Sequence, residues 1–370
     1  MRIVICGGGV IGASTAYFLS RRGVTPIVVE RTAIACAASG KAGGFLARHW
    51  CDGAALKPLA RHSFDLHAQL AQQSSEDWGY RRLVTYGGVA EARAPRRDGG
   101  DRAAVDWVSP HVEIGRQLGS PEDTAQVHPA LFTAAMMHAA QQHGAELRIG
   151  NVTGVRQAAG RVTGVEVDGE VIDAEAVVIA LGPWSILASA WLPLPAVYGL
   201  KGHSLVFATG SAVPAEALFL EYQEATGEWQ SPEFFPRPDG TTYVCAISSE
   251  SPLPIDPASV TPDPGAIKRL ERICGAVSPA FASATIVARQ ACFRPIARDG
   301  LPLIGQVAGV AGAYIATGHS VWGILNAPAT GEAMAELILD GAPRAIDLSP
   351  FDPGRLRPFD PARLRSVRPG

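Results

Sequence analysis

Residues 1–30 read MRIVICGGGVIGASTAYFLSRRGVTPIVVE, and this stretch decides the fold. The apolar run from Arg2 to Cys6 is typical of a strand that is buried on both faces. Apolar residues then recur at helical spacing from Val10 to Arg22, which predicts a helix. A second apolar run, Pro26 to Val29, predicts a strand that ends at an acidic residue, Glu30. Strand, helix and strand in this order predict a dinucleotide-binding unit.

Three glycines join the first strand to the helix and complete a G-x-G-x-x-G motif. Gly7 permits a tight turn, Gly9 lets the backbone approach a diphosphate, and Gly12 lets the helix pack on the strand. Alone, the motif also fits an ordinary glycine-rich turn, but here its flanking elements are in the required order. The diphosphate would lie at the positive end of the helix.

The acid at the end of the second strand indicates which dinucleotide fits. Glu30 can accept hydrogen bonds from a ribose diol, and its charge would repel a 2′-phosphate. NAD or FAD therefore fits better than NADP, although neighbouring Arg31 weakens this exclusion.

Composition limits the remaining possibilities. The 370 residues are 47% hydrophobic and 18% charged, which is typical of a globular protein with about two domains. The net charge of −3 gives no general attraction for nucleic acid, and no apolar run is long enough for a transmembrane segment. The first strand begins beside Met1, so we expect no cleavable signal peptide.

The six cysteines contain no C-x-x-C pair. We therefore expect neither a metal site nor a disulfide framework, and we predict a reducing, cytoplasmic setting. These residues are Cys6, Cys36, Cys51, Cys245, Cys274 and Cys292.

Farther along, the pattern alternates between two types. The small residues of 35–44 form a loop that lets the backbone run close to a flat ligand. Leu83 to Ala92 predicts a strand, a turn and a second strand. Residues 93–102 mix basic and acidic side chains, which indicates a mobile, solvated surface loop and not a phosphate site. From 199 to 289, short strands, proline-rich turns and one helix, Pro264 to Val277, predict an antiparallel sheet.

Four separated motifs agree with one family. The sequence resembles the D-amino-acid-oxidase-like FAD-dependent oxidoreductases, which include glycine oxidase and sarcosine oxidase. Segments 39–47 and 319–322 are most similar to a poorly characterised branch of it. The motifs are Gly7–Gly12, Ala180–Ser185, Arg294-Pro295 with Asp299–Gly305, and Gly318–Gly331.

The resemblance implies an α/β fold with a Rossmann-like FAD-binding domain that is discontinuous in sequence. An α+β substrate domain, built on an antiparallel sheet, would be inserted into it. We expect the FAD-binding domain at residues 1–82, 128–198 and 291–345, the substrate domain at 83–127 and 199–290, and an extended C-terminal tail at 346–370.

The resemblance also implies where FAD would lie. Its diphosphate would lie over the glycine turn, its ribose on Glu30 and its adenine against the backbone of Val152, while the helix after Gly318 would point at the pyrimidine end of the flavin. The expected cofactor-binding residues are Gly7, Gly9, Val10, Ile11, Gly12, Glu30, Arg31, Ser39, Gly40, Lys41, Ala42, Gly43, Val152, Ala180, Leu181, Gly182, Trp184, Gly318, Gly323, Ile324 and Leu325.

The implied activity is oxidation of the C–N bond of an amine or amino acid by hydride transfer to the flavin. Oxygen would accept the electrons and give hydrogen peroxide. Two alternatives remain open: a dehydrogenase of the same fold that passes electrons to a quinone or protein carrier, and a flavin-binding assembly factor without turnover.

Four residues are candidates for direct action on the substrate or flavin. Arg294 is placed where glycine-oxidase-like relatives hold the substrate carboxylate, although it could instead pair with Asp299. Lys41 would stabilise an anionic reduced flavin by charge, and His319 would support the cofactor. Near Val321 or Trp322 some relatives carry a second basic residue, and its absence here suggests a bulkier or less polar amine than glycine or sarcosine. No general base can be identified.

Cys292 matches a cysteine that is bonded to the flavin in the sarcosine-oxidase branch. It is otherwise a small buried residue of a strand, as most free cysteines are. The following residues, Phe293 to Pro295, look more like glycine oxidase, whose flavin is held without a bond. The sequence therefore favours non-covalent FAD and leaves the linkage open.

Overall fold

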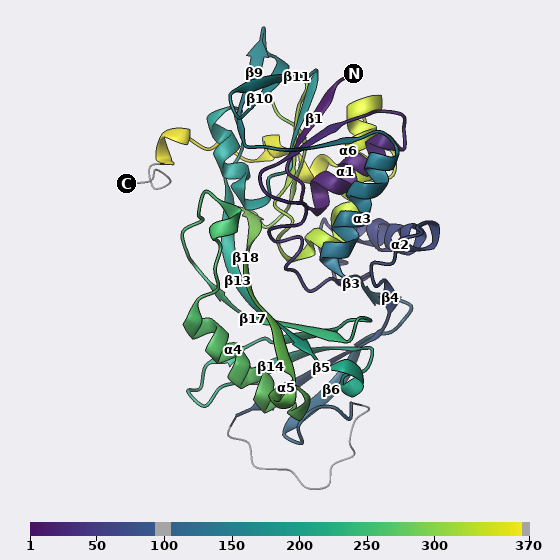
Figure 1. The fold of residues 1–370 in the computed structure, drawn as a ribbon, viewed down its shortest axis with the longest axis vertical. Helices are drawn as coiled ribbons and strands as arrows, with labels where there is room; N and C mark the ends of the chain where they lie inside the picture. The colour runs from purple at the N-terminus through teal and green to yellow at the C-terminus, as the bar shows by residue number, and fades with distance from the viewer. Residues whose placement is uncertain (93–104, 365–370) are drawn as a thin grey trace.

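The first strand and helix form where the glycine motif predicts them. In the computed structural model, which describes residues 1–92 and 105–364, β1 (Ile3–Cys6) is buried along its whole length. Helix α1 (Val10–Ser20) ends two residues before the predicted end, and β2 (Ile27–Glu30) follows. Both halves of the molecule, one above the other in Figure 1, are organised around sheets.

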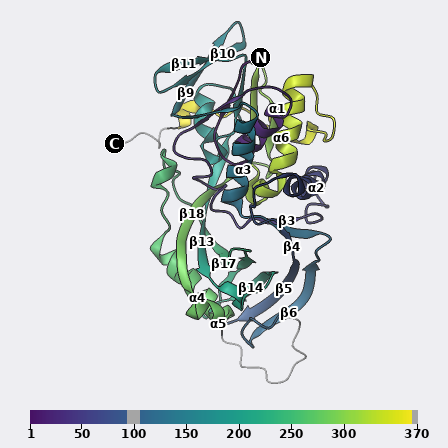
Figure 2. The ribbon, with the colours of Figure 1, turned by 45° about the vertical axis from the view of Figure 1, so that its right-hand side comes forward.

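The upper half contains a six-stranded sheet in the order β19-β20-β12-β1-β2-β8. All its pairs are parallel except β19 with β20. Helices α1, α3 and α6 lie together on one side in Figures 1 and 2, while β10 packs its valines against the other side. The added elements are β8 (Glu146–Ile149), β12 (Ala176–Ile179), β19 (Leu303–Gln306), β20 (Ala313–Thr317), α2 (Lys57–Gln73), α3 (Pro129–Gln142), α6 (Gly323–Asp340), β9 (Val152–Ala158), β10 (Arg161–Val167) and β11 (Glu170–Asp173).

The lower half is built on an eight-stranded sheet that is antiparallel except where β14 pairs with β5. Helices α4 and α5 cover one face through apolar residues. The strands are β5 (Val84–Glu91), β6 (Val112–Gly119), β13 (Val197–Ala208), β14 (Glu216–Gln223), β15 (Trp229–Gln230), β16 (Glu233–Pro236), β17 (Thr241–Ser249) and β18 (Thr285–Ala297), and the helices are α4 (Pro264–Val277) and α5 (Pro279–Ser283). The predicted α/β fold class, with its antiparallel second sheet, is confirmed.

A small sheet of β3 (Phe45–Ala47), β7 (Thr124–Gln126) and β4 (Arg81–Arg82) joins the two halves. Short 3₁₀ segments complete the described chain: η1 (Gly182–Ala190), η2 (Gly210–Ala212), η3 (Pro257–Ser259), η4 (Ser320–Trp322), η5 (Ser349–Phe351), η6 (Pro353–Arg355) and η7 (Pro361–Arg363).

Two local predictions are wrong. Residues 84–91 form one strand, because Gly87 and Gly88 produce a shift in register and not a turn. The predicted extended tail from residue 346 contains three 3₁₀ turns up to residue 364, and Phe351 is fully buried in the core. The predicted surface loop at 93–102 lies outside the described residues. The domain boundaries stay predictions, and β18 crosses the one placed between 290 and 291.

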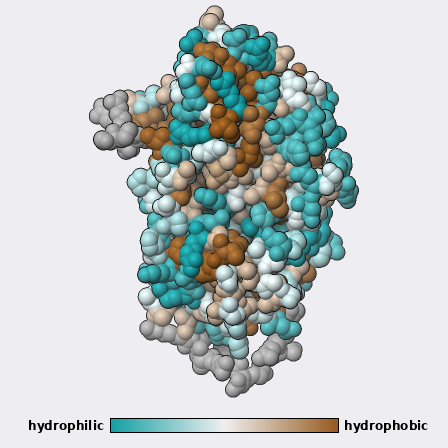
Figure 3. Space-filling model, in the orientation of Figure 1, coloured by the Kyte–Doolittle hydropathy of each residue, from teal (hydrophilic) through white to brown (hydrophobic). Residues whose placement is uncertain are grey.

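The face shown in Figure 3 is mixed. Hydrophobic residues gather in a strip on the upper half and in a smaller patch on the lower half, with hydrophilic residues around both. Among residues 1–92 and 105–364, no helix is long and apolar enough to cross a membrane.

Candidate active site

A cavity of about 750 Å³ lies between the two halves. From the upper half, its walls come from the glycine turn after β1, the end of β2, the small-residue loop, the start of β9, the turn after β12 and the start of α6. From the lower half come side chains of β13, β14, β16, β17 and β18. A volume of this size is typical of cofactor and ligand sites.

The three motif glycines have different local environments. Gly7 has a φ of +112°, and a Cβ there would lie 2.4 Å from the carbonyl oxygen of Ala180. A Cβ on Gly12 would lie 1.9 Å from the carbonyl oxygen of Gly7, so α1 approaches the turn too closely for any side chain. Gly9 has a φ of −75° and lines the cavity, where only Ser39 Oγ is near its missing Cβ, at 3.0 Å. Gly7 and Gly12 are therefore needed for packing, and Gly9 leaves room in the cavity.

The start of α1 is held by a neighbouring loop. Ser39 Oγ accepts a hydrogen bond of 2.9 Å from the backbone N–H of Val10. Val10, Ile11, Ser39, Ala42 and Gly43 line the cavity, as the sequence predicts for cofactor-binding residues.

Two members of that loop are not part of the cavity wall. A Cβ on Gly40 would lie 2.1 Å from the carbonyl oxygen of Ala35. Position 40 therefore needs a glycine because the loop turns tightly on itself there. Lys41 does not line the cavity either. Its charge nevertheless acts to lower the pKa of the Cys292 thiol, and Cys292 lines the cavity. The positive charge of Lys41 therefore acts on a group in the cavity wall although the Lys41 side chain does not line the cavity.

Glu30 lies beside the glycine turn. Its carboxylate accepts hydrogen bonds from the backbone N–H of Gly8, at 2.7 Å, and of Thr32, at 3.1 Å. Arg31 donates to Asn151 Oδ1 at 2.7 Å, and Val152 follows on the same wall of the cavity. The strand-end acid is thus fixed by backbone donors at the place where the motif predicts a ribose.

The turn after β12 forms another part of the cavity wall. Ala180, Leu181, Gly182 and Trp184 all line the cavity. The indole N–H of Trp184 donates to the carbonyl oxygen of Pro254 at 2.7 Å, which ties the turn to a segment of the lower half.

Helix α6 begins at the far end of the cavity. His319, Trp322, Gly323 and Ile324 line the cavity there, whereas Gly318 and Leu325 lie behind its wall. The ring Nε2 of His319 bonds to Thr330 Oγ1 at 3.1 Å, and its Nδ1 has no partner among the described residues. Burial lowers the pKa of His319 to about 3, so this ring is neutral at physiological pH.

This burial makes stability depend on pH. Between pH 6.5 and about 3 the unfolded chain binds a proton at His319 that the folded chain does not, so the free energy of unfolding falls as the pH is lowered through this range. We expect His319→Gln to remove about 2 kcal/mol of the decrease between pH 7 and pH 5. Urea unfolding at the two pH values, with FAD in excess, measures this difference. An equal decrease in both proteins would show that His319 does not cause it.

Arg294 lies on β18 and reaches into the cavity. Its Nη2 donates to Ser248 Oγ at 3.0 Å, and no described carboxylate forms an ion pair with it. Asp299 pairs instead with Arg355, through hydrogen bonds of 2.7 and 3.1 Å. The alternative pairing of Arg294 with Asp299 is therefore wrong.

Sequence reasoning missed the carboxyl group that shares this part of the cavity. Glu233, on β16, accepts a hydrogen bond from Cys245 Sγ at 3.5 Å. Burial raises the pKa of the Glu233 carboxyl, while Cys245 and the charge of Arg294 act in the opposite direction. The strand at 233–236 offered a signal, because a glutamate directly precedes two buried phenylalanines there.

Five aromatic residues form a wall beside Glu233, which we call the aromatic wall. Their rings lie 4.8 to 6.2 Å apart, and all of them line the cavity. They are Phe45, Trp50, Phe219, Phe235 and Tyr243.

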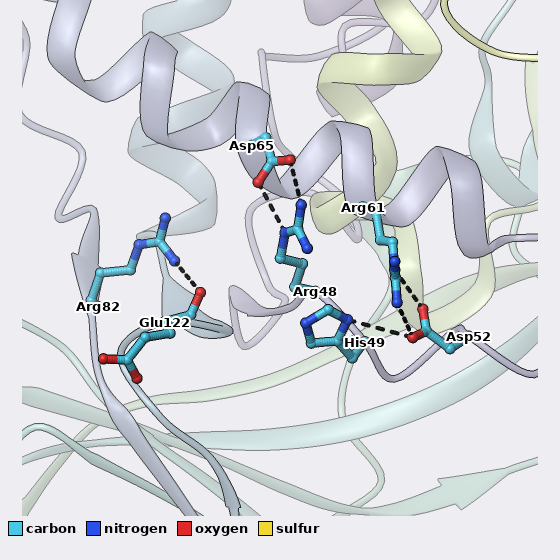
Figure 4. A network of polar contacts seen from close by, with 7 residues as sticks. All are labelled: Arg48, His49, Asp52, Arg61, Asp65, Arg82 and Glu122. Carbon is cyan, nitrogen blue, oxygen red and sulfur yellow. Dashed lines mark hydrogen bonds and ion pairs between the residues drawn. The ribbon is translucent and has the colours of Figure 1, made fainter.

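Ion pairs fix the loop that carries Trp50. Arg48 forms a two-pronged contact with Asp65 on α2, at 3.1 and 2.9 Å, and Asp52 pairs with Arg61 of the same helix (Figure 4). These contacts flank Trp50 on both sides and hold its loop against α2.

The cavity offers no candidate metal centre. Across residues 1–92 and 105–364, no group of three or more His, Cys, Asp or Glu side chains could hold a metal ion.

Comparisons with known proteins agree on one family. The model of the family described as FAD dependent oxidoreductase matches residues 2–337. An oxidoreductase of Schizosaccharomyces pombe, named without a substrate, is 30% identical, with 95% of this chain and 97% of that protein covered. Glycine oxidase of Pseudomonas putida is also 30% identical, with 96% and 99% covered. The crystal structure of glycine oxidase from Bacillus cereus has a TM-score of 0.76 at 26% identity, with 92% and 98% covered.

Proposed function

The chain belongs to the family of FAD-dependent oxidoreductases, and from this premise we propose that it oxidises the C–N bond of a carboxylate-bearing amine or amino acid. Oxygen is the proposed electron acceptor, with hydrogen peroxide as the product. One observation carries the proposal. Arg294 presents a guanidinium, which forms no ion pair with a described acidic residue, to the cavity that begins at the dinucleotide turn.

The residues around the cavity suit FAD, the cofactor of this family. A side chain at Gly9 would project into the cavity at the start of α1, where a diphosphate meets backbone N–H groups. Glu30 would hold the ribose and the backbone of Val152 the adenine, while Ala180 and Leu181 would pass close to the cofactor; all four line the cavity. At the other end, beside the start of α6, His319 Nδ1 is a buried polar atom that has no partner in the described part of the chain.

FAD supplies an acceptor for the hydride that leaves the substrate carbon. The chain's own residues would bind and orient the substrate. Arg294 matches a carboxylate fork with two parallel N–H groups, and Ser248 fixes its orientation. Lys41 would stabilise negative charge in the cavity from a distance. Trp322 would shape the part of the cavity that holds the substrate.

Hydrogen peroxide formation with a panel of amino acids tests this proposal. We expect substrate-dependent peroxide that requires the α-carboxylate. A flavin that amino acids reduce but oxygen reoxidises slowly would instead favour a dehydrogenase with a quinone or protein acceptor. A flavin that no amine reduces would favour the assembly factor. The reducing, cytoplasmic setting also stays a prediction, supported by six free cysteines.

Cys292 is the residue through which a covalent link to the flavin would form. Its thiol lines the cavity, but burial raises its pKa, and only the thiolate is a good nucleophile. We therefore expect acid precipitation to release the yellow colour into the supernatant. Colour that stays in the pellet, and that Cys292→Ser moves to the supernatant, would establish a thioether.

A further inference from the structure

Glu233 lies in the floor of the cavity and forms no ion pair with a described cationic side chain, although the charge of Arg294 acts on it from a distance. On the sheet it is directly opposite Phe219 of β14 and Cys245 of β17, and all three residues line the cavity. Its one side-chain hydrogen bond within residues 1–92 and 105–364 comes from a thiol, which is a weak donor. A half-buried carboxyl group so poorly supported gains most from a cation that enters the cavity.

The surroundings of Glu233 suit such a cation. Phe219 and Phe235 belong to the aromatic wall, and ring faces attract positive charge. A carboxylate next to aromatic faces is the combination that recognises an ammonium group.

Arg294 and Glu233 are spaced for the two charges of an amino acid. The guanidinium of Arg294 contacts Ser248, and the carboxyl of Glu233 contacts Cys245, three residues earlier on β17. A bulge in β17 sets these three residues against only two residues of β13, Gly202 to Ser204, so the two contact points are roughly 7 Å apart along the sheet. A zwitterion with a hydrogen bond of about 2.8 Å at each end spans a similar length.

We propose that Glu233 binds the ammonium group of the substrate and accepts its proton, so that the amine is neutral when its carbon is oxidised. The N–H bond breaks, the proton passes to a carboxylate oxygen of Glu233, and the nitrogen keeps the electron pair. This inference rests on the proposed function and adds the general base, with the substrate defined as a protonated amine that carries a carboxylate.

The test is the pH profile of flavin reduction without oxygen, measured on the FAD-loaded enzyme. In the wild type, the second-order rate constant of flavin reduction should rise with the ionisation of Glu233 and then level off below the pKa of the substrate amine. Glu233→Gln accepts no proton, so only the free neutral amine reacts, and this rate constant should rise tenfold per pH unit up to that pKa. Glu233→Asp should keep the wild-type profile at a lower rate.

Glu221→Gln is the matched control, because Glu221 is on the same sheet but exposed and outside the cavity wall. Its profile should equal that of the wild type. A wild-type profile in Glu233→Gln would overturn the inference and leave the proposed function intact. A wild type that no amino acid reduces at any pH would overturn both.

A binding measurement tests the same group without turnover. Trimethylglycine and 3,3-dimethylbutanoate have the same shape, but only the first carries a positive charge. By calorimetry at pH 9, the wild type should bind trimethylglycine at least tenfold more tightly, and Glu233→Gln should lose this preference. An unchanged preference in the variant would contradict the assignment.

Discussion

Arg294→Lys should raise KM for amino acids strongly while FAD remains bound. Lysine keeps the positive charge but replaces a planar fork with a point charge, so one of two parallel hydrogen bonds to the carboxylate is lost. A hydrogen bond to a charged group contributes about 1.5–3 kcal/mol, so we expect kcat/KM to fall about 10- to 150-fold. The bond to Ser248 shows that the guanidinium is already oriented in the cavity.

Steady-state rates with pairs of amino acids and their decarboxylated amines measure this effect. The loss should appear only with the amino acids. Arg298→Lys is the control, because Arg298 is exposed beyond the end of β18 and should not change the rates. Equal losses with both members of a pair, or wild-type rates with decarboxylated amines, would rule out carboxylate binding by Arg294.

Gly9→Glu should abolish FAD binding without unfolding the protein. The backbone at Gly9 has φ −75° and ψ 177°, which any residue adopts, and the side chain would enter the cavity where the diphosphate lies. Steric conflict and repulsion between negative charges should weaken binding at least 1000-fold, or about 4 kcal/mol. By contrast, a side chain at Gly12 would strike the backbone of Gly7 and destabilise the fold itself.

The measurement is FAD binding by fluorescence quenching, together with a thermal melt of the apoprotein. Gly53→Glu makes the same chemical change at an exposed glycine whose added Cβ would meet nothing within 4 Å, and it should bind FAD normally. A yellow Gly9→Glu protein would mean that the diphosphate lies elsewhere.

The sequence predicts the parts of the fold that depend on local pattern. The strand, glycine turn, helix and acid of residues 1–30 are close together in the chain, and α4 has the predicted bounds because its apolar periodicity is complete. The prediction of a turn at Gly87-Gly88 was wrong because glycine occurs in β-bulges as well as in turns. Only the register with the partner strand distinguishes the two.

The floor of the site could not be predicted, since it depends on pairing between distant strands. Glu233 gains its position from β14 on one side and β17 on the other, and neither register is visible in the sequence. The aromatic wall likewise combines residues from 45 to 243. Arg294 could be identified from its motif. That it does not pair with Asp299 depends on Arg355, and no pattern in the sequence predicts that Arg355 lies beside this aspartate.

Reduction of the bound flavin without oxygen tests the central claim most directly. Purified protein is mixed with an amino acid or with its decarboxylated amine, and the flavin absorption band is followed in time. We predict a yellow protein whose band is bleached by amino acids and far more slowly by the decarboxylated partners. A protein that binds FAD but is bleached by no amino acid, or equally well by both members of each pair, would contradict the account.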